Sequence, residues 1–187
     1  MAFLYHKLTR KVILTIILAW GAISFWFLNP LLASRLMLSA ISLVGLIVIW
    51  QESAPVFLLI LLSFSSAYAL YGFFTQWDSP IWLVMLAILI IFGYLFTYTE
   101  QKTGILGNKR LIYLVLFSLM ILEVFLALSY FHINPLNQSL VIAAVSYLFS
   151  GFCLTILARR ESARFSQYFA YALIVIAAAL LTSSWNY

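Results

Sequence analysis

The stretch SLMILEVFLALSYFHINPL, residues 118–136, shows in one place how the chain is organised. A long apolar run ends in a few polar residues, and the pair Asn134-Pro135 then opens the next apolar run. Proline is tolerated in the first turn of a helix but not in its interior, and asparagine is a preferred N-cap residue. The stretch therefore predicts the end of one apolar helix, a short turn and the start of another. Glu123 is the single carboxylate of the first helix.

The composition of the whole chain agrees with this pattern. Hydrophobic residues make up 66% and charged residues 8% of the sequence, and the mean hydropathy is +1.11. Soluble domains carry about 25% charged residues, so these values predict an integral membrane protein of the all-α class. A membrane-spanning helix needs about 20 apolar residues, so a chain of 187 residues has room for six or seven spans and for no soluble domain.

The interruptions of the apolar runs predict a polytopic bundle of seven transmembrane helices. The predicted spans are approximately 12–28, 31–50, 55–74, 80–99, 111–131, 136–158 and 166–184. The start of a span coincides with each proline, behind a predicted capping residue, in the pairs Asn29 and Pro30, Ser53 and Pro55, Ser79 and Pro80, and Asn134 and Pro135. We expect one transmembrane domain over residues 1–187. The basic N-terminal segment resembles a signal peptide, but the apolar run behind it is too long and has no A-x-A site, so we expect it to remain as the first helix.

The basic residues predict the orientation. Nine of them fall on one side of the seven predicted spans, namely Lys7, Arg10, Lys11, Lys102, Lys109, Arg110, Arg159, Arg160 and Arg164. Only Arg35 falls on the other side, so the positive-inside rule predicts a cytoplasmic N-terminus and an external C-terminus in a multi-pass protein of the cytoplasmic membrane. The net charge of +5 is then explained by the orientation of the chain in the membrane. We expect the lipid bilayer as a partner and no nucleic acid.

Small and polar side chains at helical spacing predict the faces on which helices meet, because close backbone approach drives helix association in lipid. The sixth span has one such seam, formed by Ser139, Ala143, Ser146, Ser150 and Cys153. The seventh span has Ala170, Ala177 and Ser184 a heptad apart. The second span has a polar stripe of Arg35, Ser39 and Ser42, which we expect to face protein or a wet cavity.

Glu123 leaves three interpretations open. A carboxylate at mid-membrane costs about 2.5 kcal/mol or more, so we expect it to face the bundle interior. In the first interpretation it is a neutral acid that donates a hydrogen bond to a backbone carbonyl or a serine. In the second it forms an ion pair with Arg35. In the third it binds a proton or a cation in an outward-facing pocket below Tyr130 and His132, since Glu123, Ala127 and Tyr130 share one helical face.

Several functions of seven-helix proteins need residues that this sequence lacks. The predicted seventh span has no lysine for a retinal Schiff base, and both histidines lie at or beyond predicted helix ends, unlike haem ligands inside a membrane. The sequence has no H-E-x-x-H motif, no row of arginines for voltage sensing, and no basic partner beside Ser150 for serine proteolysis. The single cysteine, Cys153, excludes an intrachain disulfide and a cysteine metal cluster. We expect no cofactor and no metal site.

Two function classes remain after a third is set aside. An enzyme acting on lipid head groups needs clustered acids or histidines at one interface, whereas the five acids are scattered over both sides of the predicted membrane. A bundle with one or two polar tethers favours a non-enzymatic membrane subunit or accessory protein with a membrane-protein partner. The alternative is a transporter or a substrate-capture component for a small apolar molecule, because an aromatic-rich interior can hold such a ligand without charges.

The second half of the chain carries a resemblance. Glu123 is followed by ALSYFHINPL at 127–136, a helix of small residues, the basic turn RRESAR at 159–164 and a last helix that ends near Trp185. This order of features resembles small seven-helix membrane proteins of unknown function from candidate-phyla bacteria. The resemblance covers roughly residues 111–187 and implies a bacterial cytoplasmic-membrane protein without an assigned activity.

Overall fold

The computed structural model describes residues 2–29, 31–103, 110–131, 133–153 and 163–183. These residues form seven helices and no strands. In chain order the helices are α1 (Ala2–Leu28), α2 (Leu32–Gln51), α3 (Pro55–Gln76), α4 (Ile81–Thr103), α5 (Arg110–Ser129), α6 (Pro135–Phe152) and α7 (Ala163–Leu181). The prediction of an all-α chain is therefore confirmed for the described residues.

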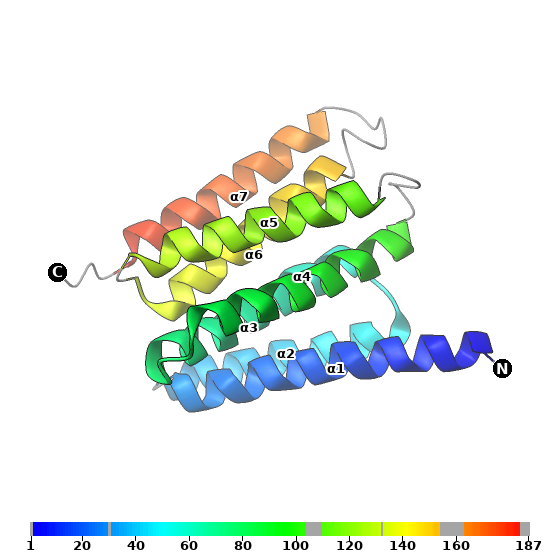
Figure 1. Cartoon of the computed structure of the whole chain (residues 1–187), viewed down its shortest axis with the longest axis horizontal. Coiled ribbons are helices and arrows are strands. Elements are labelled where there is room, and N and C mark those ends of the chain that lie inside the picture. The colour runs from blue at the N-terminus through cyan, green and yellow to red at the C-terminus, as the bar shows by residue number, and fades with distance from the viewer. Residues whose placement is uncertain (1, 30, 104–109, 132, 154–162, 184–187) are drawn as a thin grey trace.

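The helices lie side by side with their axes along one common direction, and successive helices run in opposite directions (Figure 1). Helix α1 begins at one end of the bundle and α7 ends at the other. Helix α3 is central, because it packs on α1, α4 and α6, whereas α2 packs mainly on α1 and α7 packs on α6. The bundle thus has a buried helix in the middle and two helices at its margins.

The central position of α3 depends on close approach of its neighbours. A methyl group added at Gly21 of α1 would lie 2.4 Å from the Cβ atom of Ser65 on α3, so these two helices touch where only a glycine fits. Large apolar side chains fill the interior on either side, including Leu62 of α3, Phe92 of α4 and Phe117 of α5, each with no exposed surface. Small residues set the helix spacing and large ones fill the remaining space, as expected for helices packed in lipid.

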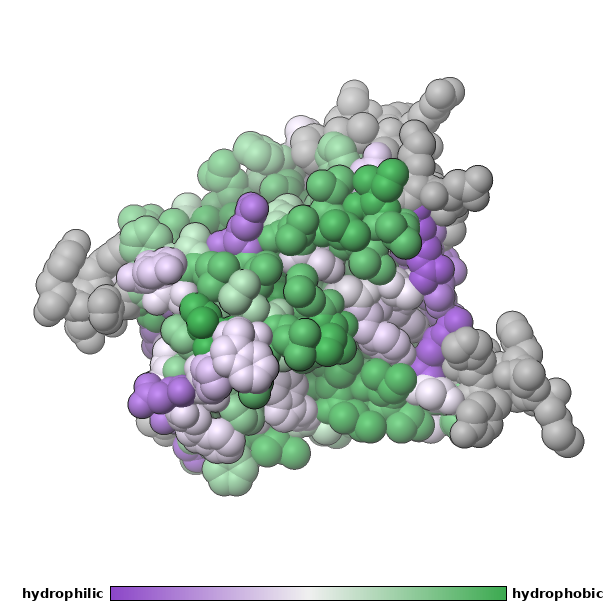
Figure 2. All heavy atoms as spheres, viewed as in Figure 1, coloured by the Kyte–Doolittle hydropathy of each residue, from purple (hydrophilic) through white to green (hydrophobic). Residues whose placement is uncertain are grey.

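Within the described residues five helices, α1 to α5, are long and apolar enough to cross a membrane. The described surface of the bundle agrees, since hydrophobic side chains cover much of its length and hydrophilic ones gather mainly at its ends (Figure 2). The sequence therefore encodes a helical bundle of the multi-pass membrane type. The last part of the predicted sixth span, residues 154–158, lies outside the described residues.

The prolines mark the helix starts as predicted where the structure describes them. Pro55 and Pro135 are the first residues of α3 and α6, and α4 begins directly after Pro80. Asn134 caps α6, because its Oδ1 atom accepts a hydrogen bond of 3.0 Å from the Leu136 amide. The cap predicted at Ser53 is wrong. Ala54 occupies the N-cap position of α3 in a left-handed conformation with φ of 46°, and no side chain caps this helix.

Candidate functional site

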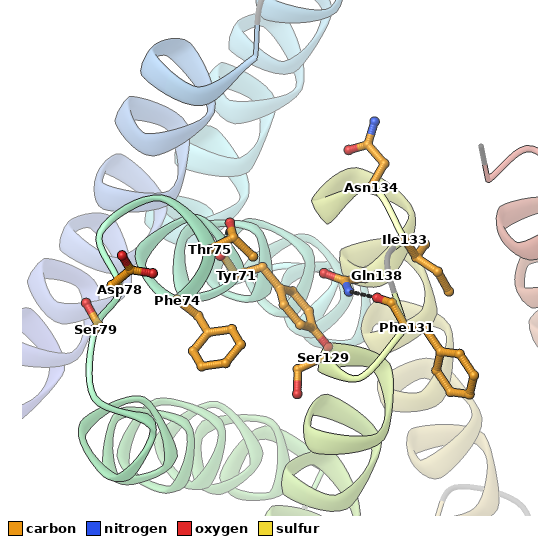
Figure 3. A pocket seen from close by; sticks show the side chains of 10 residues that line it. All are labelled: Tyr71, Phe74, Thr75, Asp78, Ser79, Ser129, Phe131, Ile133, Asn134 and Gln138. Atoms are coloured by element: carbon orange, nitrogen blue, oxygen red, sulfur yellow. Dashed lines mark hydrogen bonds between the residues drawn. The ribbon is translucent and has the colours of Figure 1, made fainter. Parts of the chain in front are cut away.

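A cavity of about 720 Å³ opens at the end of the bundle where α3 and α5 finish and α6 begins (Figure 3). Its lining residues are Tyr71, Phe74, Thr75, Asp78, Ser79, Ser129, Phe131, Ile133, Asn134 and Gln138. Ligand pockets in proteins typically have volumes of about 300–1,000 Å³. The cavity therefore has the size of a small-molecule site, and its wall combines aromatic, hydroxyl, amide and carboxylate groups.

Helix α3 supplies one wall of this cavity because Tyr71, Phe74 and Thr75 recur at helical spacing on the same face. Tyr71 is fully buried, and its ring stacks on Phe125 of α5 with ring centroids 4.0 Å apart. Its hydroxyl donates a hydrogen bond of 3.1 Å to the Phe125 carbonyl. These buried contacts hold α3 against α5 beside the cavity.

Gln138 forms the floor on the α6 side and has only 2% of its surface exposed. Its Nε2 atom donates to the carbonyls of Leu128, at 2.8 Å, and Phe131, at 3.3 Å. These carbonyls belong to the last turn of α5 and the residues after it, where carbonyls lack helical partners. The Oε1 atom of Gln138 has no hydrogen-bond partner among the described residues. Figure 3 shows it turned away from Phe131, toward Tyr71 and Thr75.

The carboxylate of the cavity comes from the turn between α3 and α4. Asp78 adopts φ of 44°, a left-handed conformation that aspartate and asparagine tolerate better than most residues. Its side chain is exposed, and no base of the described residues pairs with it. Among the described residues no basic side chain lines the cavity, and His132, between the lining residues Phe131 and Ile133, lies outside them. The described part of the chain therefore leaves this carboxylate uncompensated.

At the opposite end of the bundle the carboxylates are paired. Glu52 closes α2 in a left-handed conformation with φ of 56°, which brings its side chain between α1 and α4. There it forms ion pairs with Lys11, at 3.3 Å, and with Lys102. Glu100 is buried and lies 3.2 Å from the Nε atom of Arg110. The charge pattern of the sequence placed Lys11, Lys102 and Arg110 on one side of the membrane but did not predict these ion pairs.

Glu123 does not face the interior, so that prediction is wrong. Its side chain is exposed on the outer face of α5, and Ala127 and Tyr130 are exposed on the same face. Figure 2 shows hydrophilic atoms within the hydrophobic surface of the bundle in this region. Helix α5 turns Phe117, Ile121 and Phe125 inward instead, and the opposite side of the helix carries the acid. The three residues share a face as predicted, but that face lines none of the described cavities. His132 lies outside the described residues.

The ion pair considered for Glu123 and Arg35 is not formed. Arg35 donates from its Nε atom to the Asn29 carbonyl, and its guanidinium lies 5.6 Å from the ring centroid of Trp26. Ser39 accepts a hydrogen bond of 2.8 Å from the indole of Trp26. The polar stripe of α2 is thus turned toward α1, and Ser42 is half-buried on the same helix. Arg35 tethers α2 to the end of α1, and it does not reach α5.

The two predicted packing faces differ in outcome. The seam residues of α6 are all buried: Ser139, Ala143, Ser146, Ser150 and Cys153. On α7, however, Ala170 is exposed and Ala177 is only half-buried, so the predicted face is not the one that packs. Ala172 and Ala179, also a heptad apart, are the buried pair. Helix α7 therefore has two sets of small residues at heptad spacing, and it packs through Ala172 and Ala179. Ser184 lies outside the described residues.

A second cavity, of about 360 Å³, lies between α1 and α3 and is almost wholly apolar. It is lined by Trp20, Ile23, Ser24, Phe27, Leu28, Gly72, Phe73 and Trp77.

Among the described residues no group of three histidine, cysteine, aspartate or glutamate side chains is placed to hold a metal ion. No protein-family model, curated protein or solved structure matches this chain.

Proposed function

We propose that the chain crosses the cytoplasmic membrane seven times, with its N-terminus in the cytoplasm, and serves there as a non-enzymatic subunit or accessory protein. Helices α1 to α5 support membrane insertion by their length and composition, and α6 and α7 run beside them in the same bundle. The bases that pair with Glu52 and Glu100 gather at one end of the bundle, as the positive-inside rule requires of the cytoplasmic end.

The main observation that supports the proposed subunit role is that the side chain of Glu123 is exposed. Glu123 precedes the end of α5 at Ser129 by six residues, which is about 9 Å along a helix that rises about 1.5 Å per residue. In a bilayer this depth lies within the hydrocarbon region, where an acid facing lipid costs about 2.5 kcal/mol or more. A partner that covers the outer face of α5 removes that cost.

The chemistry of this face defines the partner. Leu116, Leu119, Glu123, Ala127 and Tyr130 are exposed at intervals of three and four residues and form a stripe along α5. A transmembrane helix of another membrane protein fits such a stripe, with a basic side chain or a hydrogen-bond donor at the depth of Glu123. A hydrogen bond between membrane helices contributes about 0.6–2 kcal/mol, and apolar contacts along the stripe add to it.

Site-specific photo-crosslinking in the native membrane tests this proposal. A photoreactive residue at Leu119 or Ala127, on either side of Glu123, is expected to capture one defined protein. The matched controls are Leu43 of α2 and Ile174 of α7, which are each 62% exposed and lie on other faces of the bundle. Equal capture from all four positions, or capture of lipid alone, would contradict a partner on the α5 face.

Substitution of Glu123 distinguishes an effect on partner binding from an effect on the stability of the bundle. Leucine at this position is expected to leave the isolated bundle as stable or more stable, because an apolar side chain is favoured in lipid, and to abolish co-purification of the partner. Glu123→Gln keeps the hydrogen-bonding capacity and removes the charge. Retained co-purification in that variant indicates a hydrogen-bond donor on the partner, and lost co-purification indicates a basic residue. Unchanged co-purification in the leucine variant would remove Glu123 from the interface.

The apolar cavity between α1 and α3 favours a second candidate function, capture of a small apolar molecule. Its aromatic wall includes Trp20, Phe73 and Trp77, and its volume is large enough for a small apolar ligand. A ligand that binds only the folded state raises its thermal stability in a concentration-dependent way. Trp77 is 69% exposed, so Trp77→Ala is expected to remove the ligand-induced shift with little effect on the unliganded protein. No shift with any apolar compound from the source membrane would exclude this candidate.

A further inference from the structure

We propose that a third pocket, of about 250 Å³, binds a phosphate group. It lies at the end of the bundle opposite Glu52, where α1 and α3 end and α2 and α6 begin (Figure 1). Its lining residues are Leu28, Asn29, Leu31, Ser34, Tyr68, Gly72, Gln76, Asn134, Pro135 and Leu136. The proposal is separate from the partner at Glu123, because that residue does not line the pocket.

The two asparagines of this pocket offer hydrogen-bond donors. The Oδ1 atom of Asn29 accepts from the Leu31 amide at 2.9 Å, and that of Asn134 accepts from the Leu136 amide at 3.0 Å. Each side chain therefore keeps its Nδ2 group, with two N–H donors, for another partner. Asn29 is 7% exposed, and its Nδ2 atom is not among the enclosed polar atoms without a partner. Figure 3 shows the Asn134 amide turned away from the other side chains of the larger cavity.

Tyr68 supplies a further donor from α3. Only 4% of this residue is exposed, and its ring packs on Phe25 with ring centroids 4.6 Å apart. Its hydroxyl forms no hydrogen bond with a described residue. Unlike the enclosed hydroxyls of Ser63 and Ser66 on the same helix, it keeps accessible surface in a side chain that lines the pocket. A buried hydroxyl without a partner is unfavourable, so a ligand that accepts its proton gains a ready donor.

The charge around the pocket favours an anion. Arg35 donates to the carbonyl of the lining residue Asn29, and its charge interacts with the Tyr68 hydroxyl. It forms no ion pair with a described acid, and none of the described acids lines the pocket. Pro30 and His132, which are close to lining residues in the sequence and lie outside the described residues, are not acids. A negative ligand therefore meets a positive charge and no carboxylate.

The arrangement of the donors favours phosphate over a carboxylate. They come from the turn before α2, from α3 and from the residue before α6, so they approach the pocket from separate elements. The four oxygens of a phosphate group point in tetrahedral directions and can meet such donors, whereas the two oxygens of a carboxylate lie in one plane. The N-termini of α2 and α6 add partial positive charge. Ser34 differs from the donors, because its hydroxyl donates to the Leu31 carbonyl at 2.7 Å and keeps only acceptors.

Two sources can supply the phosphate group, namely a phospholipid head group and free phosphate. The adjoining apolar cavity favours the lipid. Leu28 and Gly72 line both the pocket and the apolar cavity, so their contact is a shared border. Phe27 and Trp77 of the apolar cavity are 83% and 69% exposed on the surface of the bundle. A phospholipid can therefore place its phosphate in the polar pocket and an acyl chain along the apolar cavity.

Thermal unfolding of the full chain in dodecyl maltoside, a detergent without phosphate, tests the proposal. The probes are sodium phosphate and the short-chain lipid dihexanoylphosphatidylglycerol. Their controls are sodium chloride at matched ionic strength and dihexanoylglycerol, which lacks the phosphate group. A probe that binds is expected to raise the unfolding temperature in a saturable way, beyond the shift of its control. No shift with either probe, or shifts no larger than those of the controls, would overturn the proposal.

Three variants show whether a shift comes from this pocket. Tyr68→Phe removes only the hydroxyl and is expected to raise the half-saturating concentration of the probe about tenfold or more. Asn29→Asp keeps the oxygen that accepts from the Leu31 amide and replaces the donor by a negative charge, so it is expected to abolish the shift. Tyr171→Phe removes an exposed hydroxyl of α7 that lines none of the described cavities, and it is expected to bind like the unaltered chain. Unchanged affinity in Tyr68→Phe or in Asn29→Asp would overturn the assignment to this pocket.

The two probes also distinguish the two sources. Tighter binding of the short-chain lipid than of phosphate, or a shift with the lipid alone, assigns the pocket to a lipid head group. Binding of phosphate that is equally tight or tighter assigns it to free phosphate. A lipid-induced shift that persists in Asn29→Asp would come from the apolar cavity alone and would overturn the head-group assignment.

Discussion

The described carboxylates at the end of the bundle around Glu52 form ion pairs, whereas those elsewhere in the described residues do not. There, Glu52 bridges Lys11 and Lys102, and Glu100 pairs with Arg110. Asp78 at the cavity and Glu123 on the outer face of α5 have no basic partner among the described residues. The chain thus supplies its own bases where ion pairs hold α1, α2, α4 and α5 together. Among the described carboxylates, Glu123 is one without a basic partner, and it is the one for which we propose a partner outside the chain.

Arg35 sharpens this contrast. Of the lysines and arginines it is the one predicted on the far side of the membrane. It lies on Asn29 and Trp26 and fastens α2 to α1. The unpaired state of Asp78 and Glu123 is therefore a property of how the helices are arranged, since a base is present and is used elsewhere.

The largest effect on stability is expected at Gln138. Its replacement by leucine removes two hydrogen bonds and leaves the Leu128 and Phe131 carbonyls with their backbone donors alone, so the free energy of unfolding should fall by about 1–3 kcal/mol. Thermal unfolding in detergent measures the change. Ser146→Ala is the control, because that hydroxyl bonds only to Ile142 of its own helix. A loss at Gln138 no larger than at Ser146 would show that the cavity floor does not depend on the amide.

A smaller loss is expected at Glu52. Glutamine there removes the charge that pairs with Lys11 and Lys102, and the side chains are partly exposed, so the cost should be about 1 kcal/mol at low salt. The cost should shrink toward zero at about 1 M salt, where the Debye length is about 3 Å. Glu123→Gln is the control and should show no such salt dependence, because no described base pairs with it. Equal salt dependence in both variants would remove the distinction between the paired and unpaired carboxylates.

The smallest effect is expected at Asp78. Because this side chain is exposed and has no described partner, Asp78→Asn should change the stability of the unliganded chain by less than about 0.5 kcal/mol. The same thermal unfolding assay measures it. A loss as large as that at Glu52 would mean that Asp78 has a structural partner.

The sequence predicted the helices better than it predicted their faces. Prolines and interrupted apolar runs predict where α3, α4 and α6 begin, because a proline restricts the backbone locally. Glu123 was predicted to face inward because an exposed acid is unfavourable in lipid. Apolar residues lie on every side of α5, however, so its sequence does not indicate which side faces the bundle interior. Helix α7 was assigned the wrong small residues for a similar reason, since Ala170 and Ala172 begin two alternative heptad sets.

The cavity could not be predicted at all from local patterns. Tyr71, Ser129 and Gln138 lie far apart in the sequence and meet only when α3, α5 and α6 are packed. The hydrogen bonds that Tyr71 and Gln138 donate to carbonyls of α5 and the turn after it are likewise a result of the packing. The ion pairs were not predicted either, although the charge pattern placed Lys11 and Lys102 on one side of the membrane.

The native mass of the protein extracted from its own membrane in mild detergent tests the central claim most directly. The account predicts a complex larger than the 21.3 kDa chain, with one stoichiometric membrane-protein partner that is lost in Glu123→Leu although the bundle stays folded. A lone chain in both samples, or a partner that remains bound to the leucine variant, would contradict the account.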